Sequence, residues 1–288
     1  MINIRNFEHT KLQNDQFPFN CFYIYNSNTL SHWHNHIEII YVSKGTCEIY
    51  INGTLYLGNT DDIILTPPNS LHSILPRDHS SYYALVIGKA LLRVLADEYH
   101  INTILTPFLY NSELTPLHIQ PNSKGFTPIL SSLKEIINES KEKNDYFESM
   151  IKIELCRFFT LLMRNHSVKS HLKNNEFASR THCLKIVIEY LSVHYQEKIS
   201  ISDMSKLINV SEQHFCRLFK SYTGKTFIEY LTLLRLEHAH EFLINTDLTI
   251  TEITELTGFC NPNYFSRIYK KYYKQSPSTT RKNFKNSY

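Results

Sequence analysis

Residues 201–220 read ISDMSKLINVSEQHFCRLFK, and residues 250–270 repeat the pattern as ITEITELTGFCNPNYFSRIYK. Leu207 aligns with Leu256 at an offset of 49 residues, whereas Arg217 aligns with Arg267 at an offset of 50. One residue is therefore inserted in the second copy. An internal repeat of this size indicates a structural unit that occurs twice, and it decides how the C-terminal third of the chain is built.

Each copy predicts a short helix, a tight turn and a second helix. Gly258 occupies the turn of the second copy and Asn209 that of the first, and both residue types accept a positive φ. Ser211 is a favourable N-cap, and Asn261 followed by Pro262 is a cap with proline at the first helical position. The second helix of each copy has an apolar face: Phe215, Leu218 and Phe219, or Phe265, Ile268 and Tyr269.

The opposite face of each second helix is polar and basic, as in a helix that lies in the major groove of DNA. Arg forms paired hydrogen bonds with guanine, Asn and Gln do so with adenine, and Lys suits phosphate. The candidate base contacts are Gln213, Cys216, Arg217, Asn263, Ser266 and Arg267. The candidate phosphate contacts are Lys220, Lys270 and Lys271. An ordinary helical hairpin with a solvated basic face is the alternative interpretation of either copy alone.

The segment between the two copies predicts a stiff connector. Residues 226–245 contain no Pro or Gly and carry apolar residues at helical spacing, so they form one helix of about 27–30 Å at 1.5 Å per residue. A spacer of that length places two groove-binding helices about 34 Å apart, which is one turn of B-DNA. The sequence therefore predicts contact with two adjacent segments of the major groove.

Residues 181–281 resemble the DNA-binding domain of the AraC/XylS family of regulators. The matching text is FCRLFKSYTGKTF at 215–227, RLEHA at 235–239, YFSR at 264–267, and the pairs Gly258-Phe259 and Ser276-Pro277. Thr254, Lys274 and Thr280 depart from the family's usual Ala, Gly and Tyr. The resemblance covers about a third of the chain. It implies a bacterial transcription regulator that binds promoter DNA through two helix-turn-helix units.

The first part of the chain has a different residue pattern from the second, and together the two parts predict an α+β protein with two domains. No Pro occurs between Pro128 and Pro262, so the second part is a run of helices, whereas the first part is broken into short pieces. We expect a sensing and dimerisation domain over 1–166, a polar linker over 167–179 and an all-α DNA-binding domain over 180–288. From residue 177 onward there are 15 Lys or Arg and 10 Asp or Glu, a basic balance that suits nucleic acid.

The first domain predicts a small antiparallel β-barrel. The expected strands are 22–25, 38–43, 46–51, 54–57, 63–66 and 82–87, and Asn52-Gly53 is typical of a type I′ hairpin turn. A short helix is expected over 89–100, and a helical pair follows at 128–143 and 146–164. These two helices either only pack on the barrel or also pair with a second copy in a homodimer.

Four polar residues two or four apart predict a cluster that points into the barrel. They are His32, His34, His36 and Glu38, and His72 joins them from a neighbouring strand. The spacing of His32, His34, Glu38 and Gly45 resembles the first cupin motif, which implies a jelly-roll-like barrel and no particular metal. Polar lining for an organic effector, such as a sugar or related metabolite, is the leading interpretation. A Zn, Fe or Mn site and a purely structural role are the alternatives.

Further features narrow the class of protein. We find no serine-hydrolase, phosphate-loop or zinc-protease motif, no apolar run of membrane-spanning length and no C-x-x-C pair among six Cys. We therefore predict a cytoplasmic, non-enzymatic regulator without a cofactor, whose partners are promoter DNA, a small molecule, a second copy and RNA polymerase. The alternatives are a metal-dependent cupin enzyme fused to a DNA-binding domain, and a regulator whose first domain only dimerises.

Overall fold

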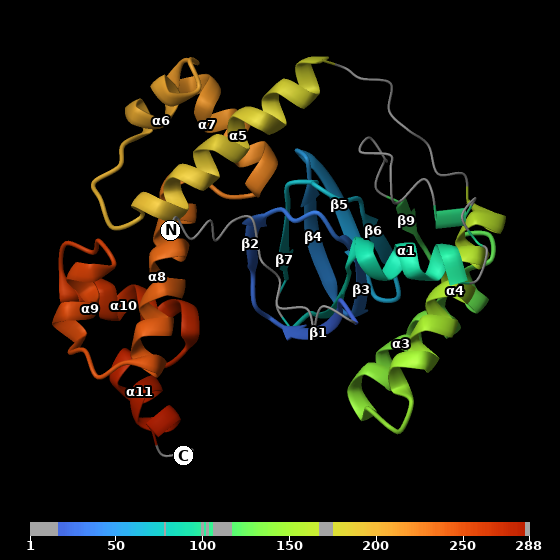
Figure 1. Cartoon of the computed structure of the whole chain (residues 1–288). Helices are drawn as coiled ribbons and strands as arrows, with labels where there is room; N and C mark the ends of the chain where they lie inside the picture. The colour runs from blue at the N-terminus through green and yellow to red at the C-terminus, as the bar shows by residue number, and fades with distance from the viewer. Residues whose placement is uncertain are drawn as a thin grey trace. The chain divides into compact units, whose positions relative to one another are not determined.

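The computed structural model describes residues 17–77, 79–98, 101, 104–105, 117–166 and 175–285 (Figure 1). The chain divides into two compact units, with the division between His182 and Cys183. The first unit holds the β-strands with helices α1, α3 and α4, and the second holds the helices from the end of α5 to α11. Each unit is described by itself below.

The first unit contains two antiparallel sheets. One has the order β1 (Phe19–Tyr25), β8 (Ser81–Ile87), β3 (Ile37–Lys44), β6 (Ile63–Thr66) and β9 (Leu117–Ile119). The other has the order β2 (Thr29–His32), β7 (His72–Pro76), β4 (Thr46–Ile51) and β5 (Thr54–Asn59). The predicted barrel is thus a pair of sheets that share a small apolar interior, and the strands do not close into one continuous ladder.

The β4–β5 hairpin shows why these residues form strands. Alternate residues of β4 are buried, as expected for a strand with one face on the core. Asn52 and Gly53 both have positive φ, at 47° and 84°, which is the conformation of the predicted two-residue turn. The interior between the sheets is filled by Ile40, Val42, Cys47, Ile49, Ile51, Ile64, Ile74, Tyr82 and Ala84.

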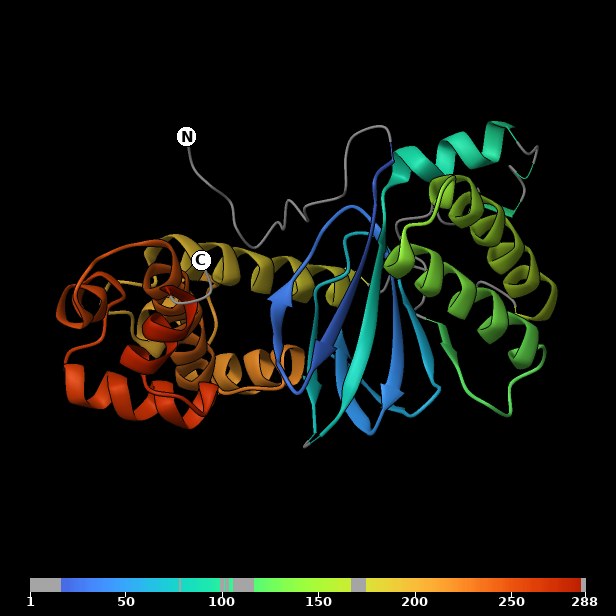
Figure 2. The same cartoon turned by 90° about the horizontal axis from the view of Figure 1, so that it is seen from below.

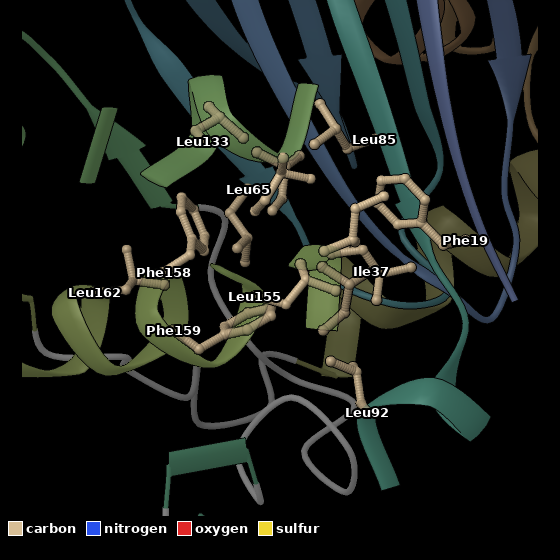
Figure 3. Packing of buried hydrophobic residues seen from close by; sticks show 14 of the residues in the cluster. Phe19, Ile37, Leu65, Leu85, Leu92, Leu133, Leu155, Phe158, Phe159 and Leu162 are labelled. Carbon is tan, nitrogen blue, oxygen red and sulfur yellow. The ribbon is translucent and has the colours of Figure 1, made fainter. Parts of the chain in front are cut away.

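Helices cover the outer face of the five-stranded sheet. They are α1 (Lys89–Glu98), α3 (Phe126–Glu142) and α4 (Phe147–Asn165), and they lie on the same side of the sheets (Figure 2). Their apolar faces meet the sheet in the largest buried cluster of the chain as described, in which Phe158 of α4 lies beside Leu65 of β6 (Figure 3). Because the helices cover this face, polar side chains on the opposite face of the sheet lie between the two sheets.

The second unit consists of helices alone. Their bounds are α5 (Asn175–His194), α6 (Ile201–Leu207), α7 (Glu212–Thr223), α8 (Phe227–Asn245), α9 (Ile250–Leu256), α10 (Pro262–Tyr273) and α11 (Pro277–Lys285). The predicted repeat appears as the pairs α6–α7 and α9–α10, joined by α8. Side chains cap the starts of α6 to α10: Ser200, Thr226 and Thr249 form capping boxes, and Ser211 and Asn261 accept bonds from the first turn.

The elements missing from the sequence predictions are short. β2, β7 and β9 have three to five residues each, too few to show alternation. The predicted polar linker 167–179 overlaps a helix, because α5 begins at Asn175. The remaining linker residues, 167–174, lie outside the described residues.

Glu237 in α8 gives the second unit a pH-dependent stability. Burial, and then the nearby Glu241, raise the pKa of its carboxyl to about 8, and Tyr230 and Tyr273 also interact with it. The folded chain therefore holds a proton that the unfolded chain releases near its ordinary pKa of 4.5. The free energy of unfolding contributed by this group decreases as the pH rises from about 4.5 to about 8.

The substitution Glu237→Gln removes this ionisation. We expect it to raise the melting temperature by about 5 °C at pH 9 and to leave it nearly unchanged at pH 5, as measured by circular dichroism. Glu189→Gln, at an exposed position of α5, serves as the control with no difference between the two pH values. Equal shifts for Glu237→Gln at both pH values would contradict the prediction.

Candidate functional site

The second helix of each repeated pair presents one polar face to solvent. In α7 the residues Phe215, Leu218 and Phe219 are buried, and in α10 Phe265 and Tyr269 are fully buried. The turn that precedes each of these helices has the predicted positive φ, 55° at Asn209 and 75° at Gly258. The two helix-turn-helix pairs therefore have the same internal order of core, turn and exposed face.

The structure places the predicted DNA contacts on these exposed faces. Exposed side chains are Gln213, Arg217, Lys220, Asn263, Arg267, Lys270 and Lys271, and half-buried ones are Cys216 and Ser266. Within each helix the candidates lie three or four residues apart, which brings them to one side. Each face thus offers an amide, a small side chain, a guanidinium and an ammonium, the groups that bind base edges and phosphates.

The two faces differ in the residue that lies beside the arginine. The Arg267 guanidinium lies over the ring of Tyr264, 5.5 Å from its centroid, and Tyr264 is 43% exposed. A cation–π contact of this kind restricts the positions of the arginine. In α7 the equivalent position is occupied by His214.

Sequence patterns did not reveal a hollow beside α7. It has a volume of about 380 Å³ and is lined by Ile201, Cys216, Arg217, Lys220, Thr226, Phe227 and Ile228. Ile228 is 57% exposed, an unusual position for an isoleucine at the start of a helix. Three of the predicted contacts, Cys216, Arg217 and Lys220, line the hollow, so it forms part of the same surface.

The polar cluster of the first unit comes from three strands and one connection. His32 ends β2, Glu38 follows the start of β3 and His72 begins β7, where it pairs with His32 across the two strands. His34 lies in the connection between β2 and β3. The chain bends after Trp33, so the four side chains meet across neighbouring strands and not from alternate positions of a single strand.

Glu38 is the centre of this cluster. Its Oε2 lies 3.0 Å from His34 Nε2 and 2.8 Å from His72 Nε2, and the carboxylate is 3% exposed. Burial opposes ionisation of Glu38, but the charge of His72 and the hydrogen bonds from His34 and His72 hold its pKa well below the ordinary value. A buried carboxylate is thus kept ionised by imidazoles.

Backbone carbonyls fix the hydrogen positions on two of the imidazoles. His32 Nδ1 lies 2.9 Å from Leu30 O, and His72 Nδ1 lies 2.9 Å from Ser70 O. A carbonyl only accepts, so each Nδ1 carries the hydrogen and each neutral ring has its lone pair on Nε2. His72 Nε2 faces a carboxylate oxygen, so a cation, either a proton or a metal ion, must lie between the two atoms.

His36 lies at the side of this group. Its ring centroid is 5.5 Å from that of His34, and burial, then His34 and Lys89, lower its pKa to about 4. Burial, then His72 and His34, lower the pKa of His32 to about 3. Both rings are therefore neutral at pH 7, and Glu38 is the anion of the cluster.

Buried polar atoms near the cluster have no hydrogen-bond partner among the described residues. They are His34 Nδ1, His36 Nδ1 and Thr66 Oγ1. Thr66 is fully buried in β6 and lies opposite Glu38 in the β3–β6 ladder. Its position beside the cluster was not predicted from the sequence, because Thr is common in strands and does not by itself indicate a binding site. Buried polar atoms without partners are costly, so these atoms indicate a polar ligand or water.

The donor set also fits a metal ion. One ligand atom from each of His32, His34, Glu38 and His72 lies within 4.8 Å of the other three. Ligands about 2.1 Å from one ion are roughly 3–4 Å from one another, so a small closure would complete a site. Imidazole and carboxylate suit Zn, Fe or Mn, and a carbonyl that orients the outer ring nitrogen is typical of metal-bound histidine.

Two family models match the chain, one in each unit. Residues 24–155 match the AraC-like ligand binding domain, and residues 204–283 match a helix-turn-helix domain. The first match contains the polar cluster, and the second contains both recognition helices. The chain belongs to the AraC-type transcription regulators, with a ligand-binding domain followed by a DNA-binding domain.

Curated relatives agree with this assignment. An uncharacterized HTH-type transcriptional regulator of Bacillus subtilis, YdeC, is 23% identical over 253 residues, covering 87% of this chain and 85% of that protein. The lactose operon transcription activator of Staphylococcus xylosus is 33% identical over 97 residues, covering 34% of this chain and 35% of that protein.

Solved structures to which the chain is similar include ToxT from Vibrio cholerae and the DNA-binding domain of AdpA in complex with a target DNA. ToxT is 15% identical, with a TM-score of 0.39, and covers 91% of this chain and 97% of its own. The AdpA domain is 22% identical, with a TM-score of 0.35, and covers 36% and 94%. Among the described residues, no helix has the length and apolar content needed to cross a membrane.

Proposed function

We propose that this regulator binds promoter DNA through α7 and α10 together, in two adjacent segments of the major groove. The observation that carries the proposal is the pair of exposed polar faces on helices whose other sides are buried. Gln213, Arg217, Asn263 and Arg267 contact bases, and the lysines contact phosphates. We assign residues 1–166 to effector binding and dimerisation and 180–288 to DNA binding.

The small-molecule effector binds at the polar cluster. His34, His36 and Thr66 offer polar atoms without partners, and Glu38 offers an ionised oxygen. A hydroxylated metabolite, such as a sugar, supplies both donors and acceptors for these groups. The effector changes DNA affinity only to the extent that it binds one state of the regulator better than another.

A transition-metal ion is a second candidate for the effector. The fixed tautomers of His32 and His72 favour it, because in each ring Nε2 is the nitrogen that can ligate an ion, and that of His72 lies 2.8 Å from Glu38 Oε2. When bound, the ion would be held by those two imidazoles, His34 and Glu38, and it would supply positive charge to a buried anion. The chain would then respond to metal supply, and it need not have enzymatic activity.

The regulator also acts as a homodimer in this proposal. Met150 and Ile153 of α4 are 42% and 49% exposed, three residues apart, and the N-cap Tyr146 before them is 84% exposed. A row of exposed apolar side chains on one helix suits an isologous contact with a second copy. RNA polymerase is a further partner, and the DNA partner implies the cytoplasm.

Arg267 tests the DNA assignment. We expect Arg267→Ala to weaken specific binding by about 1–3 kcal/mol and to relax the preference at one base pair, because the stacked guanidinium contacts a guanine. Lys270→Ala is expected to weaken binding to all sequences alike. Both are measured by mobility shift on duplexes that the full chain selects from random DNA.

The matched control for this test is Arg164→Ala, which removes an exposed arginine from α4 in the other unit. Its affinity and sequence preference are expected to equal those of the unaltered chain. Unchanged affinity and preference for Arg267→Ala would remove this residue from the DNA interface.

Metal analysis by mass spectrometry separates the two effector candidates. If the ion is the effector, untagged protein incubated with Zn²⁺, Fe²⁺ or Mn²⁺ retains about one ion per chain, and His72→Ala and Glu38→Ala lose it. His118→Ala is the control, because His118 pairs with Asp62 at 2.8 Å outside the cluster. No retained metal in the unaltered chain leaves the organic effector, which thermal-shift screening with sugars then identifies.

A substitution that introduces a charge tests whether the exposed apolar residues of α4 form the dimer contact. We expect Ile153→Lys to convert the dimer to a monomer in light scattering after size-exclusion chromatography, because it places an ammonium in an apolar contact. Glu135→Lys, at an exposed position of α3, is expected to remain dimeric. A dimer that persists in Ile153→Lys at micromolar concentration would place the contact elsewhere.

A further inference from the structure

We propose that a clamp at the end of α5 holds the two recognition helices at a fixed distance and angle. The clamp consists of the turn Tyr195–Glu197, Arg235 and His238 of α8, and Gly258 in the turn between α9 and α10. It connects the segment that leads into the first helix-turn-helix pair with both the connecting helix and the second pair. The residues at its centre contact no base in the proposed function.

Arg235 makes the strongest contact of the clamp. Its Nε donates to Tyr195 O at 2.7 Å, and its Nη2 donates to Glu197 O at 2.7 Å. Two donors of one planar guanidinium thus bind two carbonyls two residues apart, a fork that the single ammonium of lysine does not reproduce. The turn is therefore fixed in both position and direction relative to α8.

Ring stacking adds a second contact between the same elements. The rings of Tyr195 and His238 are 3.9 Å apart and nearly parallel, at 10°. His238 lies three residues after Arg235 in α8, so both side chains project from one side of that helix. Together they bind the turn through its backbone and through its side chain.

Gly258 brings the second helix-turn-helix pair onto the same turn. A Cβ at this position would lie 2.5 Å from Gln196 O and 2.8 Å from Gln196 C, and Gly258 has a φ of +75°. The backbone of the α9–α10 turn therefore packs directly against the backbone of Gln196. No side chain larger than hydrogen fits between them.

These contacts link the two helix-turn-helix pairs directly to each other, in addition to their common attachment to α8. α8 is joined to α7 through residues 224–226 and to α9 through residues 246–249. Phe219 of α7 packs on Phe227 and Tyr230 of α8, and α8 shares an apolar cluster with α9 and α10. The clamp adds a direct link between the entry of the first pair and the turn of the second, so the two pairs are held to each other as well as to α8. One base pair of B-DNA corresponds to roughly 3.4 Å and about 35° of rotation, so small errors would misplace one helix.

The inference rests on the proposed function, because it assumes that both helices bind one duplex. The probe is a duplex selected by the full chain from random DNA, with one or two base pairs inserted between its two contacted segments. We expect the unaltered chain to lose at least about ten-fold in affinity on one insertion. Arg235→Ala is expected to bind the selected duplex several-fold more weakly and to lose less than about three-fold further on insertion.

Further variants keep the test independent of simple destabilisation. Arg235→Lys and Tyr195→Leu each remove part of the clamp and are expected to show an intermediate dependence on spacing, whether or not Arg235→Ala folds. Thr232→Ala, which removes a hydroxyl bonded only within α8 to Ile228 O, serves as the control with the unaltered spacing dependence. Melting curves confirm that each variant is folded at the assay temperature.

Two results would overturn the proposal in distinguishable ways. Folded clamp variants that bind more weakly but keep the full penalty for insertion would show that the contacts only stabilise the unit. Equal affinity of the unaltered chain for every spacing would show that the two helices do not engage one duplex, and the proposed function would fail together with the clamp.

Discussion

The amphipathic character of α7 and α10 is the constraint on which the second unit depends. Each helix must bury an aromatic row, such as Phe215 and Phe219 or Phe265 and Tyr269, to hold its unit together. The same burial turns the amides and guanidinium groups outward, because residues three and four apart share a side. The core and the polar face proposed to bind DNA are therefore two sides of a single pattern, and neither can change freely without the other.

The first unit depends on a different constraint, which is a charge placed in an apolar interior. Glu38 is held ionised by imidazoles whose own hydrogen positions are set by backbone carbonyls. Burying an ionised carboxylate costs free energy, and apolar side chains in its place would stabilise the core at least as well. Its retention among isoleucines and valines supports a role in binding, through an organic ligand or a metal ion.

The sequence predicted the second unit more fully than the first. The repeat, the caps at Ser211 and Asn261 and the long α8 depend on local patterns of 3.6 residues, and the structure has them at the expected places. The polar cluster depends on pairing between β2 and β7 and on a bend after Trp33. Strand pairing over forty residues leaves no local trace, so the spacing of the histidines alone does not give the geometry in which they meet. Thr66 and the clamp of Arg235 also depend on such distant contacts.

The unequal support of the two arginines has a consequence for the DNA itself. Arg267 rests on Tyr264, whereas Arg217 follows His214 and borders an apolar hollow. In the proposed binding mode, α7 and α10 of one chain would meet two dissimilar DNA segments in a fixed order, and the target of that chain would have no internal dyad. Reversing such a target would reverse the direction of the bound chain along the promoter.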